Sequence, residues 1–269
     1  MKIPAPLAHA VSVRWRWLAP AAVIVFLIAA FTHMPAADAV AWLLPQTSSL
    51  RPYGVTGTVS HGQLASLRSG AREITGDLRW TLQPWWLAAG RLAFRVDSSG
   101  EPRVRGGIQF TPHTLRAAGL TLDSPLKPLL EDAGYGFAPL DGLLHLHIER
   151  ATVTGRGVEA LAAQASVRSL RWAAGSQPIE LGNLQARASM PAAHHVEIRV
   201  TTPSGPVDTH GTVSIADSGA YEVDLRFKPR KDASPAALDL LKTMGQPDAT
   251  GSWRLATRGT LGVVPAPRG

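Results

Sequence analysis

The fold is decided by residues 76–94, GDLRWTLQPWWLAAGRLAF, which contain one short pattern twice. In each copy, the first being GDLRW at residues 76–80, apolar residues occupy the second and fourth positions after a glycine. Successive side chains of a strand point to opposite faces, so Leu78 and Trp80 share one face and the charged residues share the other. Pro84 cannot donate to a ladder, so it ends the first strand. The stretch predicts two half-buried strands joined by a short turn or bend, with Trp80 in the core.

The same pattern recurs along the chain, at irregular spacing. Further copies start at Gly106, Gly142, Gly182, Gly211 and Gly251. Irregular spacing argues against a propeller or a helical solenoid, whose repeats have a fixed period. The pattern instead predicts a mainly β protein, built as an elongated, curved antiparallel sheet or as a sandwich.

Two short helices are expected within this β protein. Residues 124–133 and residues 234–245 each begin with a serine that can cap a helix, followed by a proline in the first turn, and a glycine lies at or just after the end of each. Residues 157–172 are ambiguous, because their first half has a helical composition and their second half alternates.

Composition excludes several classes of function. The net charge is +7 over 269 residues, but basic residues are interspersed with acidic ones and form no run, which argues against a nucleic-acid partner. The chain has no cysteine, which removes disulfides, thiolate nucleophiles and cysteine-based zinc sites.

The N-terminal region predicts a membrane anchor. Residues 15–34 include an uncharged run and are long enough to cross a bilayer as a helix. Positive charges precede this segment and none follows it until Arg51, so the N-terminus is expected in the cytoplasm. A cleaved signal peptide is the alternative, because residues 37–39, ADA, have the small-x-small form of a cleavage site.

The anchor divides the chain into five parts. These are a cytoplasmic N-terminus (1–14), the transmembrane anchor (15–34), a juxtamembrane linker (35–52), a periplasmic β domain (53–262) and a flexible tail (263–269). The protein is therefore expected in the cell inner membrane as a single-pass protein with its C-terminal domain in the periplasm.

The sequence contains no convincing motif for catalysis or for metal binding. His145 and His147 share a strand face, but no spacing supplies the three or four convergent ligands of a metal site. No nucleophile elbow or phosphate-binding loop occurs. We therefore expect no enzymatic activity, no metal and no cofactor. The adjacent Trp85 and Trp86 are the candidate surface contact, to membrane or to a partner.

Three segments together resemble the type II secretion system protein N family, GspN. They are GTVSHG at residues 57–62, LRWTLQPWWL at residues 78–87, and LLKTMGQPDATGSWRL at residues 240–255, where Met244 replaces the family's usual leucine. The resemblance extends over about residues 15–262, and the order and spacing of the segments carry it. It implies an inner-membrane component of the type II secretion machinery, with a periplasmic domain, no enzymatic activity and other secretion subunits as partners.

A second resemblance keeps a lipid-handling function open. Strand-rich, glycine-punctuated domains behind one anchor also look like the AsmA-type family, whose curved sheets offer an apolar groove to acyl chains. An assembly module should cover one face of its sheet with helices or with an opposite sheet. A lipid carrier should leave a continuous apolar groove open.

Overall fold

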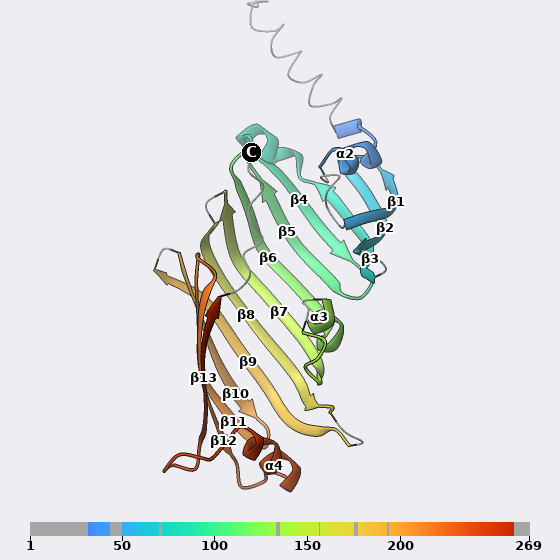
Figure 1. The fold of residues 1–269 in the computed structure, drawn as a ribbon. Helices are drawn as coiled ribbons and strands as arrows, with labels where there is room; N and C mark the ends of the chain where they lie inside the picture. Colours follow the sequence, from blue (N-terminus) through green and yellow to red (C-terminus); the bar gives the residue numbers. More distant parts are fainter. Residues whose placement is uncertain are drawn as a thin grey trace, which may run out of the picture.

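The computed structural model describes residues 32–43, 50–69, 72–132, 135–155, 157–174, 177–192 and 194–260. Thirteen strands in this part of the chain form one antiparallel sheet, in which each strand pairs with the next along the chain (Figure 1). The strands are β1 (Leu50–Gly57), β2 (His61–Ser69), β3 (Arg72–Leu82), β4 (Leu92–Ser98), β5 (Arg103–Phe110), β6 (Thr114–Pro125), β7 (Leu140–Thr154), β8 (Gly157–Trp172), β9 (Ile179–Ala192), β10 (His195–Ser204), β11 (Val207–Ala216), β12 (Ala220–Pro229) and β13 (Trp253–Thr260). The prediction of a mainly β protein with an antiparallel sheet is confirmed. Of the two predicted arrangements, the sandwich is wrong, because the described strands form one sheet.

Figure 1 shows how the sheet is arranged from β1 (blue) to β13 (red). The strands at its two ends run in a different direction from β5–β8 in the middle, as the twist accumulates from strand to strand. In the described part of the chain, four short helices accompany the sheet: α2 (Ala36–Leu43), η1, a 3₁₀ helix (Pro84–Ala89), α3 (Leu126–Asp132) and α4 (Pro235–Thr243).

The register of β3 confirms the predicted alternation. Leu78 pairs with Leu64 on β2, and Trp80 pairs with Gly62 on β2 and Val96 on β4. Arg79 between them faces the other side of the sheet and is exposed. Trp80 is half-buried rather than part of a closed core, because the described residues form no second sheet over this part of the first one.

The connection between β3 and β4 differs from the prediction. Pro84 does end the strand region, but η1 replaces the expected short turn. Gly90 ends η1 in the left-handed conformation, with φ of 68°, which a glycine adopts without a steric penalty. The second copy of the pattern therefore begins at a helix cap.

The two expected helices have different outcomes. The Oγ of Ser234 accepts a hydrogen bond from the backbone N–H of Ala237 at 3.2 Å, as predicted for the cap of α4. Ser124 is not a cap, because β6 continues to Pro125 and the Ser124 hydroxyl donates to the Pro125 carbonyl. That helix, α3, is thus shorter than predicted and starts at Leu126.

The ambiguous segment 157–172 is one long strand, β8. It pairs with β7 on one side and β9 on the other, so ladder hydrogen bonds on both edges outweigh the helical propensity of its alanines. Ala163 and Ala165 pack on the pleated surface instead of forming a helical turn.

The N-terminal boundary also differs from the sequence division. α2 lies in the segment 35–52 expected as a linker, and β1 begins at Leu50. The backbone N–H of Val59 donates to the Met34 carbonyl at 3.0 Å, and Ala36 is buried. Residues 34–36 are therefore docked on the turn between β1 and β2.

The predicted anchor and tail lie largely outside the described residues. Residues 15–31 of the anchor and all of residues 263–269 fall there. Within the described ranges, no helix combines the length and the apolar character needed to cross a membrane.

Candidate interaction surfaces

One face of the sheet is apolar across most of its width. Residues paired directly across antiparallel strands share a face, so the register defines rows that run from strand to strand. One such row runs from β5 to β13: Val104, Leu122, Leu146, Ala165, Ala186, Val200, Gly211, Leu225 and Leu255. We call the side of the sheet that carries this row the apolar face.

The apolar face is covered by a helix near one end. Ala237 and Leu241 of α4 pack on Val207 and Trp253, and Ile179 and Phe227 border this cluster. Burial of these side chains stabilises the fold by removing apolar surface from water. α4 thus holds together strands that are distant in the sequence.

Most of the remaining apolar face is only half-buried. Leu122, Leu146 and Leu225 are neither buried nor fully exposed, and Leu255 is 40% exposed. Fully covered side chains would fall to a few per cent, as Leu241 does under α4. The described part of the chain has no second sheet to cover this face.

A hollow opens beside the turn between β5 and β6. It has a volume of about 810 Å³, and its lining includes Phe110, Leu115 and Val153. Phe110 lies six residues after Val104 on β5 and so shares its face, and Leu115 pairs with both Phe110 and Val153, which places all three on the apolar face. Phe110 and Leu115 are each nearly 40% exposed, so the apolar face is accessible at this rim.

The two tryptophans predicted as a surface contact lie on η1. Trp85 is 71% exposed. Trp86 is half-buried, and the Arg91 guanidinium lies 5.7 Å from its ring centroid in a cation–π contact. Trp85 is therefore the member of the pair available to a membrane or a partner, and this contact stays a prediction.

The opposite face of the sheet is polar. One row on this side runs from β1 to β12: Thr56, Gln63, Arg79, Asp97, Arg105, Thr121, His147, Gln164, Arg187, Arg199, Thr212 and Asp224. Arg105 forms an ion pair with its row neighbour Asp97 at 2.8 Å, whereas Arg79, on the other side of Asp97, pairs with Asp77 on its own strand. We call this side the polar face.

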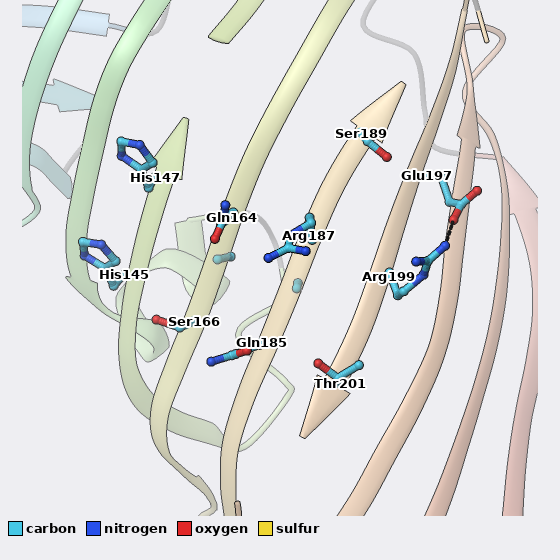
Figure 2. A pocket seen from close by; sticks show the side chains of 12 residues that line it. His145, His147, Gln164, Ser166, Gln185, Arg187, Ser189, Glu197, Arg199 and Thr201 are labelled. Atoms are coloured by element: carbon cyan, nitrogen blue, oxygen red, sulfur yellow. Dashed lines mark hydrogen bonds and ion pairs between the residues drawn. The ribbon is translucent and has the colours of Figure 1, made fainter. Parts of the chain in front are cut away.

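The polar face has its own hollow, of about 550 Å³, over β7, β8, β9 and β10 (Figure 2). His145 and His147 project from β7, and Gln164, Gln185, Arg187 and Arg199 follow on the next three strands. The two histidines thus share a face, as predicted. Each of the other three strands also contributes at least one side chain with a hydrogen-bonding group.

No cluster of metal-binding side chains occurs among the described residues. They contain no group of three or more histidine, aspartate or glutamate side chains placed to hold a metal ion. His145 Nδ1 lies 2.6 Å from an Asp123 carboxylate oxygen, and His194 contacts Asp217. Both are two-residue contacts on the protein surface.

Two of the sequence segments that suggested a family meet in the structure. The indole Nε1 of Trp80 donates to the Val59 carbonyl at 3.2 Å, and the ring lies over Gly62. Gly57, with φ of 87°, forms the turn before Val59. Residues 57–62 and Trp80 therefore build one structural unit at the β1–β2 turn rather than a ligand site.

The third segment forms the loop between α4 and β13. One carboxylate oxygen of Asp248 accepts hydrogen bonds from the Thr250 hydroxyl, the Ser252 N–H and the Thr250 N–H, at 2.6, 3.0 and 2.8 Å. These bonds hold the pKa of Asp248 below its usual value, the Thr250 hydroxyl being the largest cause. Asp248 thus has a structural role in shaping this loop.

Another carboxylate on the polar face is held ionised by an arginine. Arg254 donates two hydrogen bonds to Asp224, at 2.8 and 2.9 Å. This side-chain pairing lowers the pKa of Asp224 and raises that of Arg254. The pair joins β12 to β13 at the last strand of the sheet.

Sequence reasoning missed the arginines of the polar hollow. Arg187 and Arg199 lie twelve residues apart in the chain, on strands whose register depends on the β9–β10 pairing. The only sequence signal was the alternation of each strand, which shows that a residue faces outward but not which residue it meets.

Comparison with known proteins assigns a family. The model of the family described as "Type II secretion system (T2SS), protein N" matches residues 49–256. Neither the search of curated proteins nor that of solved structures found a match. Because the family match covers most of the chain, from the end of the N-terminal segment into β13, the protein belongs to the type II secretion system protein N family.

Proposed function

We propose that this member of the type II secretion protein N family is a non-enzymatic component of the inner membrane. Its β domain assists protein export across the outer membrane from the periplasmic side, by binding other secretion subunits. The family match carries the proposal. The uncharged run at residues 17–31, with basic residues before it, supports the membrane location.

The arrangement of the sheet supports a function in binding. The residues shared with the family at Gly57, Gly62, Trp80 and Asp248 shape turns and strand contacts. β1 and β13 have a neighbouring strand on one side only among the described elements. An exposed strand edge can add a strand of a partner through main-chain hydrogen bonds, which makes both edges candidate docking sites.

The position of α2 supports an uncleaved N-terminus. Cleavage after Ala39 would remove the buried Ala36 and the hydrogen bond between Met34 and Val59. These contacts join the predicted anchor to the β domain at the β1–β2 turn. A tether of this kind raises the effective concentration of the domain toward other inner-membrane subunits.

Secretion in a deletion strain tests the proposal. The β domain, released from residues 1–31 and directed to the periplasm by a cleavable signal, should fail to restore secretion, whereas the full-length chain should restore it. Full restoration by the released domain would show that the tether is dispensable. Loss of secretion after mutation of a single histidine, aspartate or serine, in a folded and abundant protein, would point to chemistry instead.

Lipid binding is a second candidate function, and the open apolar face favours it. The row from Val104 to Leu255 is half-buried for most of its length, and the hollow at Phe110 and Leu115 opens at its rim. Acyl chains that covered this surface would remove it from water. An assembly module that buries this face within its own chain would not leave it so accessible.

Adjacent residues on β6 provide a matched test of lipid binding. Leu122 lies on the apolar face and Thr121 on the polar face. Lipids that copurify with the full-length chain should be lost on Leu122→Lys and retained on Thr121→Lys. Equal lipid content in the two variants and the wild type would contradict binding at this face, and secretion assays of the same variants would show whether lipid is needed for export.

A further inference from the structure

Two arginines face each other in the hollow of the polar face. Arg187 on β9 and Arg199 on β10 are directly paired in the register, and Figure 2 shows both side chains on this face. They are the only like-charged neighbours in the polar row that runs from Thr56 to Asp224. Like charges directly opposite each other destabilise a strand pair, so this placement calls for a counter-charge.

The protein supplies a counter-charge for one of the two. Arg199 donates to Glu197 at 3.1 Å (Figure 2). The Arg187 guanidinium has no side-chain hydrogen bond or ion pair with another described residue, and its neighbours across the ladder are Arg199 and the uncharged Gln164. Glu149, the next carboxylate, accepts from the Gln164 amide at 2.9 Å. The hollow therefore contains one uncompensated positive charge, at Arg187.

Beside Ala165 and Ala186, the rest of the lining consists of polar side chains capable of hydrogen bonding. His147 lies one strand beyond Gln164, and Gln185, Ser166, Ser189 and Thr201 complete the surroundings. The volume of about 550 Å³ is in the range of small-molecule sites. A guanidinium presents parallel N–H donors that match phosphate oxygens, and amides and hydroxyls match the hydroxyl groups of a polyol.

We infer that this hollow binds a phosphodiester carried by a hydroxyl-rich group, with Arg187 as the main contact to its single negative charge. A monoanion balances the one uncompensated arginine. The same chemistry occurs in a soluble glycerol phosphodiester and in the headgroup of an anionic phospholipid. The site is independent of the proposed role in secretion and lies on the face opposite the candidate acyl-binding surface.

Calorimetric titration of the full-length chain tests this site with two probes. Glycerophosphoglycerol is the soluble phosphodiester, and dihexanoyl phosphatidylglycerol, kept below its critical micelle concentration, carries the same headgroup on short acyl chains. We expect saturable binding of at least one probe, weakened about tenfold or more by Arg187→Gln. Arg187→Lys keeps the positive charge but loses the parallel N–H donors of the guanidinium, so it should weaken probe binding less than Arg187→Gln does.

Arg116→Gln is the matched control for the loss of one charge. Arg116 is an exposed arginine on β6 that pairs with Gln109 and Thr152, and it does not line the hollow. Binding should change less than about twofold in this variant. Equal weakening by Arg116→Gln and Arg187→Gln, or no binding of either probe, would overturn the inference. If Arg187→Gln abolishes binding of dihexanoyl phosphatidylglycerol but leaves binding of glycerophosphoglycerol unchanged, the hollow binds a lipid headgroup.

Discussion

The indole Nε1 of Trp253 donates a hydrogen bond to the backbone carbonyl of Gly245 at 2.9 Å. This bond joins the first residue of β13 to the loop that follows α4. The ring also packs on Val207, Ala237 and Leu241, in the one cluster of mutually packed buried residues that the described chain forms. The C-terminal end of the sheet therefore depends on one residue to a large extent.

Truncation of Trp253 should destabilise the protein strongly. Trp253→Ala removes most of a buried aromatic side chain and leaves a cavity under α4, at a cost of about 3–5 kcal/mol in the free energy of unfolding. Trp253→Phe keeps the ring contacts and loses the hydrogen bond, at a cost of about 1 kcal/mol beyond the change in ring size. Chemical denaturation of the full-length chain measures both. Leu255→Ala, at a 40% exposed position of the same strand, should cost less than Trp253→Ala.

The alternation of β3 can be tested with adjacent residues. Trp80→Ala removes a half-buried ring and its hydrogen bond to Val59, so it should cost roughly 3 kcal/mol, the lower end of the range for large aromatic truncations. Arg79→Ala on the polar face should cost under about 0.5 kcal/mol. Equal shifts in melting temperature would show that the register is wrong, since a slip of one residue exchanges the faces.

Gly62 lies under the Trp80 ring, so added volume there should be harmful. A Cβ at this position would collide with the indole, and Gly62→Ala should cost about 1–3 kcal/mol through displacement of the ring. Gly107→Ala is the control, because a Cβ there would meet only the Ala118 carbonyl, at 3.4 Å. Thermal melting of both variants should separate them, and a smaller shift for Gly62→Ala than for Gly107→Ala would contradict the packing of Trp80.

The loop at Asp248 should make stability depend on pH. Its pKa in the folded protein lies below the ordinary value of 3.8, so its contribution to stability is fully present above pH 3.8 and is lost as the pH falls through the lower folded pKa. Asp248→Asn should therefore be less stable than the wild type at pH 7, and the difference should narrow below pH 3.8. Denaturation of both proteins across this range measures the effect. Asp232→Asn, an exposed position, should remain close to the wild type at pH 7.

The proposed topology predicts the position of the C-terminus. A reporter that is active only in the periplasm, fused after Gly269, should be active, and the mature protein should keep its full length. Immunoblotting and N-terminal sequencing of the membrane fraction measure the length. A product that starts near Val40 would favour a cleaved signal peptide and would lack the docked residues 34–36.

Local patterns in the sequence were sufficient for the alternation of β3 and for α4. The period-two alternation around Leu78 and Trp80 determines which side chains share a face, because that period is a property of each strand by itself. The cap of α4 was equally local, since Ser234 bonds to a backbone N–H only three residues away. The absence of cysteine ruled out disulfides and thiolate chemistry by composition alone.

Tertiary structure alone decided what depends on pairing between strands. The alanine-rich half of β8 is extended because β7 and β9 pair with it on both edges, and β6 extends through Ser124 because β7 pairs with it there. The choice of a single sheet over a sandwich also required the full order of strands. Arg187 and Arg199 lie opposite each other because of the β9–β10 register. That register is set by many contacts between residues distant in the sequence, so it cannot be read from the pattern of either strand alone.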